Sequence, residues 1–93
     1  MSIGTFVKQP GEVLDYTTSL KQWLPQGDFA ISLTTTASDG ITVDSTLITD
    51  EGEGICVWLS GGTSGKKYKI QVQFVTDQGR TKEYEFFVKV KES

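Results

Sequence analysis

A chain of 93 residues is long enough for one domain, and its net charge of −3 is unfavourable for binding nucleic-acid phosphates. The single cysteine, Cys56, excludes an internal disulfide, and the lack of histidine excludes a Ser-His-Asp triad and leaves too few ligands for zinc. No apolar run approaches the roughly 20 residues of a membrane span and no signal peptide follows Met1, so we expect cytoplasmic synthesis and no membrane partner.

The first 11 residues are predicted to form an extended arm in front of a domain that spans residues 12–93. Pro10 cannot donate a hydrogen bond to a sheet, so this stretch is either an edge strand or a tail. We expect the arm to be held by the body of the domain, by a neighbouring copy or by a different partner.

Between residues 12 and 60, short apolar runs alternate with turn residues, which predicts five short strands. We place these strands at residues 12–18, 29–36, 41–43, 45–49 and 55–60. Alternation in the second of them predicts that four side chains face the core, namely Phe29, Ile31, Leu33 and Thr35.

Two of the connections have features of their own. Residues 19–25 have helical spacing of apolar side chains and end at a proline, which predicts one helical turn that lays Trp23 over one end of the domain. Residues 50–54 are rich in acids but lack the ligand spacing of a calcium loop, so we interpret them as a solvated turn.

The last third of the chain is predicted to be a long hairpin. Every second residue of 68–76 and of 84–90 is apolar or Thr, as in half-buried antiparallel strands, and Gly79 supplies a positive φ in the turn between them. Tyr68 stands where immunoglobulin-like sandwiches place a tyrosine whose hydroxyl bonds to upstream backbone. We therefore predict an all-β, immunoglobulin-like sandwich of about seven antiparallel strands with an extended N-terminal arm.

No grouping of residues points to catalysis, because the acids lie in predicted turns or on outward strand faces. We expect no enzymatic activity, no cofactor and no metal. Apolar residues on faces that should meet water instead suggest protein contacts. The candidate partner-binding residues are Phe6, Val7, Lys8, Trp58 and Phe87. Local packing, such as cover by the arm, is the alternative explanation for the last two.

Two stretches of the sequence carry a family resemblance. The first is Phe6-x-Lys8-x-Pro10-x-Glu12-Val13-Leu14-Asp15-Tyr16, followed by Trp23-Leu24 and Gly27-Asp28. The second is Val57-Trp58-Leu59-Ser60-Gly61-Gly62-Thr63, then Gly65, Tyr68 and Arg80-Thr81-Lys82-Glu83. Together they resemble the small immunoglobulin-like virion structural proteins of tailed bacteriophages, of the tail-fibre adaptor type.

The resemblance implies a non-enzymatic virion protein, made in the host cytoplasm, that joins fibre or head components to the tail or neck. The implied partners are other virion proteins (portal, tail, head–tail connector or fibre proteins), with multiple copies per particle and no nucleic acid. An alternative hypothesis is a capsid decoration or glycan-binding module, in which Trp58 or Trp23 stacks on a sugar.

Overall fold

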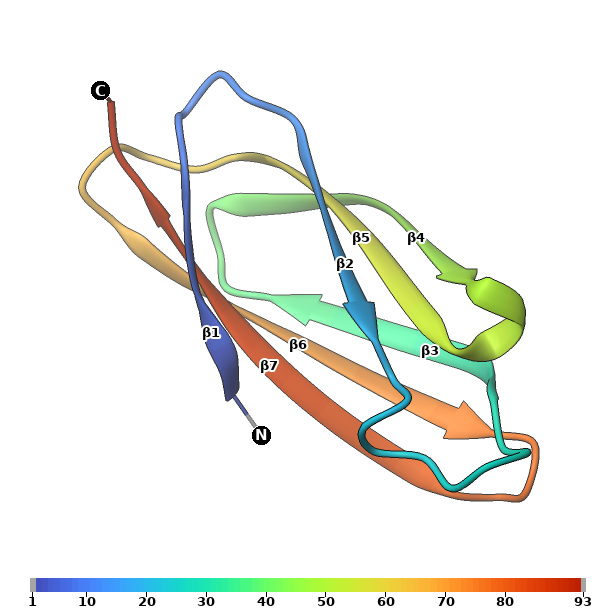
Figure 1. Ribbon diagram of the computed structural model, residues 1–93. Coiled ribbons are helices and arrows are strands. Elements are labelled where there is room, and N and C mark those ends of the chain that lie inside the picture. Colours follow the sequence, from blue (N-terminus) through green and yellow to red (C-terminus); the bar gives the residue numbers. More distant parts are fainter. Residues whose placement is uncertain (1, 93) are drawn as a thin grey trace.

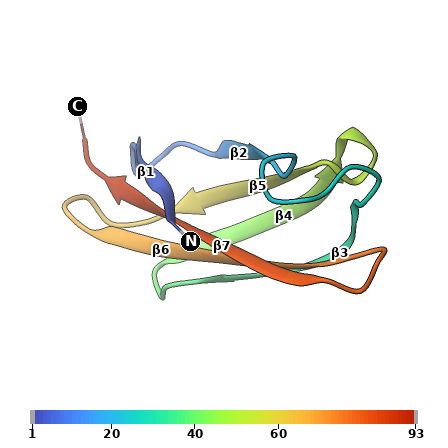
Figure 2. The same cartoon turned by 60° about the horizontal axis from the view of Figure 1, so that its bottom comes forward.

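The computed structural model describes residues 2–92 as a sandwich of two β-sheets (Figure 1). Its elements are β1 (Ser2–Lys8), β2 (Leu14–Ser19), β3 (Ala30–Ala37), β4 (Ile41–Thr49), the one-turn 3-10 helix η1 (Asp50–Gly52), β5 (Gly54–Gly61), β6 (Lys67–Thr76) and β7 (Thr81–Val90). The first sheet has the strand order β1-β7-β6-β3 and the second sheet β2-β5-β4, which Figure 2 shows as two stacked layers. The predicted all-β, immunoglobulin-like sandwich is confirmed.

The N-terminal segment is an edge strand of the first sheet. β1 pairs in parallel with β7, whereas the other four strand pairs are antiparallel. The body of the domain therefore holds residues 2–8 of the predicted arm; Met1 lies outside the described residues. The predicted division of the chain into an arm, residues 1–11, and an independently folding domain, residues 12–93, stays a prediction.

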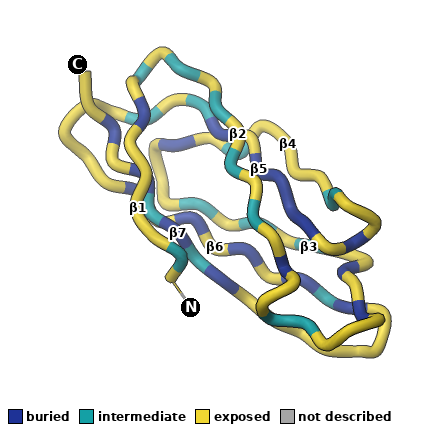
Figure 3. The backbone as a smooth tube through the Cα atoms, in the orientation of Figure 1, coloured by how far each residue is buried: buried dark blue, intermediate teal, exposed yellow. Residues whose placement is uncertain are grey.

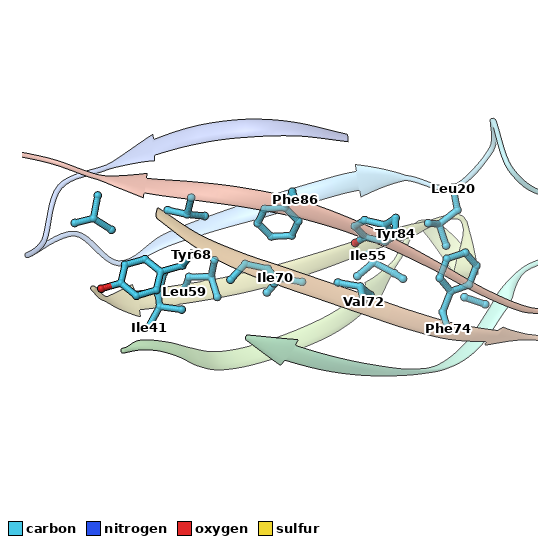
Figure 4. Close-up of a cluster of buried hydrophobic side chains, with 14 residues drawn as sticks. Leu20, Ile41, Ile55, Leu59, Tyr68, Ile70, Val72, Phe74, Tyr84 and Phe86 are labelled. Carbon is cyan, nitrogen blue, oxygen red and sulfur yellow. The ribbon is translucent and has the colours of Figure 1, made fainter. Parts of the chain in front are cut away.

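The core lies between the two sheets and is supplied mainly by β5, β6 and β7. The alternation predicted for the long hairpin is confirmed, because every second side chain is buried over residues 68–76 of β6 and residues 84–90 of β7 (Figure 3). Figure 4 shows these side chains meeting Ile55 and Leu59 of β5 between the layers. Gly79 has φ +89° in the turn between the two hairpin strands.

The aromatic ring of Tyr84 is stacked within this core, and burial raises the pKa of its phenol to about 12. The ring of Trp23 packs on it with 5.2 Å between ring centroids. Residues 19–25 form a turn closed by a 2.9 Å hydrogen bond from the Trp23 N–H to the Leu20 carbonyl, in place of the predicted helical turn. Among the described residues, no helix has the length and apolarity to cross a membrane.

Two predictions about the middle strands were wrong, and β-bulges explain both. In β3, Ala30 pairs with Thr76 and Ser32 with Val75, so Ile31 is an extra residue and is 55% exposed instead of facing the core. Phe29, which precedes β3, is also exposed, and Ala30 is buried in the core instead. The predicted strands at residues 41–43 and 45–49 are one strand, β4, with a bulge between Val43 and Ser45.

The tyrosine predicted to anchor the connection before β6 does so. The Tyr68 hydroxyl accepts a 2.8 Å hydrogen bond from the Thr63 backbone N–H, and this bond lowers the pKa of Tyr68. The chain passes close to the core here, since a Cβ on Gly62 would lie 2.7 Å from Val90 Cγ2. Tyr68 thus fixes the loop that leads from the second sheet back to the first.

Removal of this hydroxyl tests its role. Tyr68→Phe should lower the free energy of unfolding by about 1 kcal/mol, because the Thr63 N–H loses its partner. Tyr16→Phe is the matched control, since the Tyr16 hydroxyl is buried and has no hydrogen-bond partner within the part of the chain that the structure describes. Removal of the Tyr16 hydroxyl should leave the free energy of unfolding unchanged or raise it, because no hydrogen bond is lost and a buried polar group without a partner is removed. Urea denaturation compares the two, and equal effects would contradict the role assigned to Tyr68.

Candidate partner-binding surfaces

Lys8, one of the sequence-predicted contact residues, is buried inside the domain. Its side chain is 0% exposed, and the Nζ group donates to the carbonyls of Gln9 at 2.8 Å, Pro10 at 3.4 Å and Gly61 at 2.6 Å. An ammonium has three N–H donors, so the three carbonyls together can solvate the buried charge. Lys8 thus joins β1 to the end of β5, and its use by a partner stays a prediction.

Phe6 also points inward, and it closes one side of the sandwich. Its ring lies 5.4 Å from the ring of Tyr16 in the second sheet and 5.8 Å from that of Phe86 in the first sheet. The ring is nevertheless 38% exposed, because β1 is an edge strand with no neighbour beyond it in the sheet. Phe6 can therefore pack internally and still present one ring edge to a partner.

Val7 and Phe87 lie together on the outer face of the first sheet. Val7 pairs with Lys89, and Phe87 pairs with Thr5, so both side chains point away from the core. Val7 is 56% exposed, whereas Phe87 is half-buried under the Lys67 ammonium, which stands 4.7 Å from its ring centroid. The apolar residues and the lysines around them are called the basic patch, which comprises Val7, Lys67, Lys69, Phe87 and Lys89.

Trp58 lies on the opposite side of the molecule, on the outer face of the second sheet. It pairs with Asp15 of β2 and with Ser45 of β4, and it is 37% exposed. Leu47, on the same face of β4, is 59% exposed, and Val13 just before β2 is 56% exposed. These residues and the neighbouring acids are called the acidic patch, which comprises Val13, Asp15, Asp44, Leu47 and Trp58.

The five predicted contact residues therefore do not form one surface. Val7 and Phe87 lie in the basic patch, Trp58 lies in the acidic patch, and Phe6 and Lys8 belong largely to the interior. Sequence reasoning missed Val13 and Leu47, although alternation with the buried residues of the second sheet could have placed Leu47 outside. The bulge in β4 obscured that signal, because it shifts the phase of the alternation.

The end of the sandwich near Asp28 holds a shallow depression of about 240 Å³, lined by Lys21, Leu24, Pro25, Gln26, Asp28 and Glu53. Asp28 is unavailable for chemistry there. Its carboxylate accepts hydrogen bonds from the backbone N–H groups of Phe29 at 3.0 Å and Gln78 at 3.2 Å, and from the Arg80 guanidinium at 2.8 Å. Among residues 2–92, no cluster of His, Cys, Asp or Glu is arranged to hold a metal ion.

The pKa of Asp28 follows from this environment. Burial raises the pKa, but hydrogen bonds from Thr76, Arg80, Gln78 and Phe29 outweigh burial and hold the pKa below its usual value. The buried carboxylate therefore joins the loop before β3 to the turn between β6 and β7. It is a structural ion pair at the end of the sandwich that lies away from both patches.

A family model described as podophage GP4 fiber-tail adaptor protein gp77 matches residues 8–89 of the chain. No curated protein matches the sequence. Among solved structures, the chain is similar to part of a 2,6-sialyltransferase from Vibrionaceae Photobacterium sp. JT-ISH-224, with a TM-score of 0.55 and 13% sequence identity over 98% of this chain. The chain covers 17% of that enzyme chain, so the similarity shows the fold alone.

The Asp28 ion pair predicts a specific pH dependence. Because the pKa of Asp28 is lowered on folding, its contribution to stability is complete above the unfolded pKa of about 3.9 and is lost as pH falls through the folded pKa. Asp28→Asn should lower the urea midpoint at pH 7 and flatten its fall below about pH 4. The exposed Asp77→Asn serves as the control and should leave the profile unchanged. An unaltered acid profile in Asp28→Asn would contradict the assignment.

Proposed function

The chain belongs to the podophage GP4 fiber-tail adaptor family, and from this membership we propose that it is a structural adaptor of a bacteriophage virion. In this role it joins fibre or head components to the tail or neck through protein–protein contacts. The observation that carries the proposal is the family match over residues 8–89, which agrees with the resemblance drawn from the sequence. The proposal includes synthesis in the host cytoplasm and multiple copies in each particle.

The positions that carry the resemblance support a scaffold role, because they hold the fold together. Lys8 bonds to Gly61, and the Glu12 carboxylate accepts a 2.7 Å hydrogen bond from the Gln9 N–H in the turn that follows β1. The buried Asp28 carboxylate forms the ion pair with the partly exposed Arg80 guanidinium described above. None of these groups is left free to act on a substrate, which favours a non-enzymatic role.

The two patches supply surfaces suited to protein partners. Each combines apolar side chains with charges of one dominant sign, on a strand face that is rigid because the other side of the same strands forms the core. Aromatic and aliphatic anchors surrounded by polar groups are typical of protein–protein interfaces. We propose portal, tail, head–tail connector or fibre proteins, together with neighbouring copies of this chain, as the partners, with Val7, Phe87 and Trp58 among the contact residues.

Depletion of the chain during infection tests the adaptor role. A phage whose copy of this gene is silenced should produce particles without attached fibres, because the link between fibre and tail is missing. Negative-stain electron microscopy counts the fibres, and the wild-type chain supplied in trans should restore them. Fully fibred particles that lack the chain would overturn the proposal.

Substitutions separate the contact surfaces from the fold. Val7→Glu and Leu47→Glu each place a charge in a patch and should reduce rescue, whereas Ile31→Glu alters an equally exposed apolar residue outside both patches. Rescue by all three variants alike would contradict the use of the patches.

The alternative of a glycan-binding decoration module has one supporting feature. Trp58 presents part of its indole to solvent beside Asp15, and an aromatic ring next to a carboxylate can stack on a sugar and bond its hydroxyls. If this alternative holds, the isolated chain should bind a glycan array and Trp58→Ala should lose that binding. If the adaptor proposal holds, the array should show no binding.

A further inference from the structure

The acidic and basic residues of the chain are separated between the two sheets. Residues 12–19 and 39–61, which build the second sheet with its turns, contain seven acids and no Lys or Arg: Glu12, Asp15, Asp39, Asp44, Asp50, Glu51 and Glu53. Residues 62–93, which include β6 and β7, contain seven basic residues, namely Lys66, Lys67, Lys69, Arg80, Lys82, Lys89 and Lys91, and four acids. The overall charge of −3 thus divides unevenly, with −7 on the segments that build the second sheet and +3 on residues 62–93.

Two lysines of the basic patch, Lys67 and Lys89, have no acidic partner among residues 2–92. Lys67 and Lys89 are directly opposite each other in the β6–β7 ladder and both point outward. Like charges at directly opposed positions destabilise a sheet. The neighbouring Lys69 forms an exposed ion pair with Glu85 at 3.6 Å, whereas no acid within 4.0 Å pairs with Lys67 or Lys89 among residues 2–92. An acidic surface laid over this face would supply partners for both lysines.

The two patches lie on opposite outer faces of the sandwich, and the Trp58 side of the acidic patch lies nearest to the basic patch. Lys8 pairs with Val90, the residue after Lys89, and its ammonium bonds to Gly61, which lies three residues beyond Trp58 in β5. Because the patches lie on opposite outer faces, identical molecules can stack with unlike patches in contact. The apolar residues of the two patches would then meet at the centre of each contact.

We propose that copies of this chain associate head to tail, with the basic patch of one copy on the acidic patch of the next. In such a contact Trp58 and Leu47 of one copy pack against Val7 and Phe87 of its neighbour. Asp15 and Asp44 of the first copy face Lys67 and Lys89 of the second. The principal extents of 42 × 20 × 20 Å give each sandwich face an area comparable with the roughly 800 Å² per partner of a standard interface.

A contact between two different faces leaves one free patch at each end of the assembly. Repetition of such a contact closes into a ring if the rotation per copy allows it, and otherwise produces an open filament. The inference deepens the proposed function, because it states how neighbouring adaptors would contact one another in a particle with many copies. It is tested on the isolated chain, so its failure leaves the adaptor role, which is tested by fibre attachment, standing.

Sedimentation of the purified chain tests the association. The wild type should form dimers and larger species with increasing concentration at low salt. The same association should weaken strongly near 1 M salt, where the Debye length falls to about 3 Å. A chain that remains monomeric at low salt from micromolar to millimolar concentration overturns the proposal.

Charge reversal identifies the faces. Lys67→Glu/Lys89→Glu and Asp15→Lys/Asp44→Lys should each weaken self-association by roughly 100-fold or more, because each brings like charges together across the contact. Lys21→Glu/Lys82→Glu is the matched control, since it changes the net charge equally outside the patch and should associate like the wild type. Circular dichroism checks that the variants remain folded.

An equal mixture of the two charge-reversal variants is the decisive experiment. The intact acidic patch of the lysine variant matches the intact basic patch of the aspartate variant, so the mixture should associate although each variant alone is monomeric. If the aspartate variant still associates alone, the contact joins two basic patches and the head-to-tail proposal is wrong. A mixture that stays monomeric also overturns it.

Discussion

The buried ammonium group of Lys8 connects the two sheets of the sandwich at the end of β1. A buried charge is costly unless hydrogen bonds replace the lost water, and here three backbone carbonyls from the β1–β2 turn and the end of β5 do so. Since β1 belongs to the first sheet and β5 to the second, this group connects the layers at the end that carries the basic patch. A strand that could have been a loose arm thereby becomes part of a rigid body.

Two further connections complete this frame. The Tyr68 hydroxyl holds the loop after β5, close to Lys8, and the Asp28–Arg80 pair closes the far end. Between them lies the core, which is built from alternating strand positions together with Leu20 from the turn after β2. The family resemblance falls on these same connecting residues, which explains why the sequence motifs identify the fold without marking a reactive site.

Sequence periodicity correctly predicted which side chains face the core where the strands are regular. It gave wrong predictions where a β-bulge interrupts a strand. β6 and β7 alternate without interruption, so their faces and the Tyr68 bond could be predicted. The bulge at Ile31 could not, because one inserted residue moves the side chains before it to the other face. Lys8 was expected at the surface because no neighbouring residue in the sequence indicates that three backbone carbonyls converge on its ammonium group. The contact residues were therefore assigned to one group, although the fold distributes them over two faces and the interior.

Amide hydrogen exchange of the full chain tests most directly whether the buried Lys8 ammonium makes β1 part of the rigid body. The account predicts that the β1 amides paired with β7 exchange as slowly as other edge-strand amides in the wild type. In Lys8→Met, which keeps the apolar stem but removes the donors, they should exchange far faster while β6 remains protected. Rapid exchange of the β1 amides in the wild type, or equal protection in both proteins, would contradict the account.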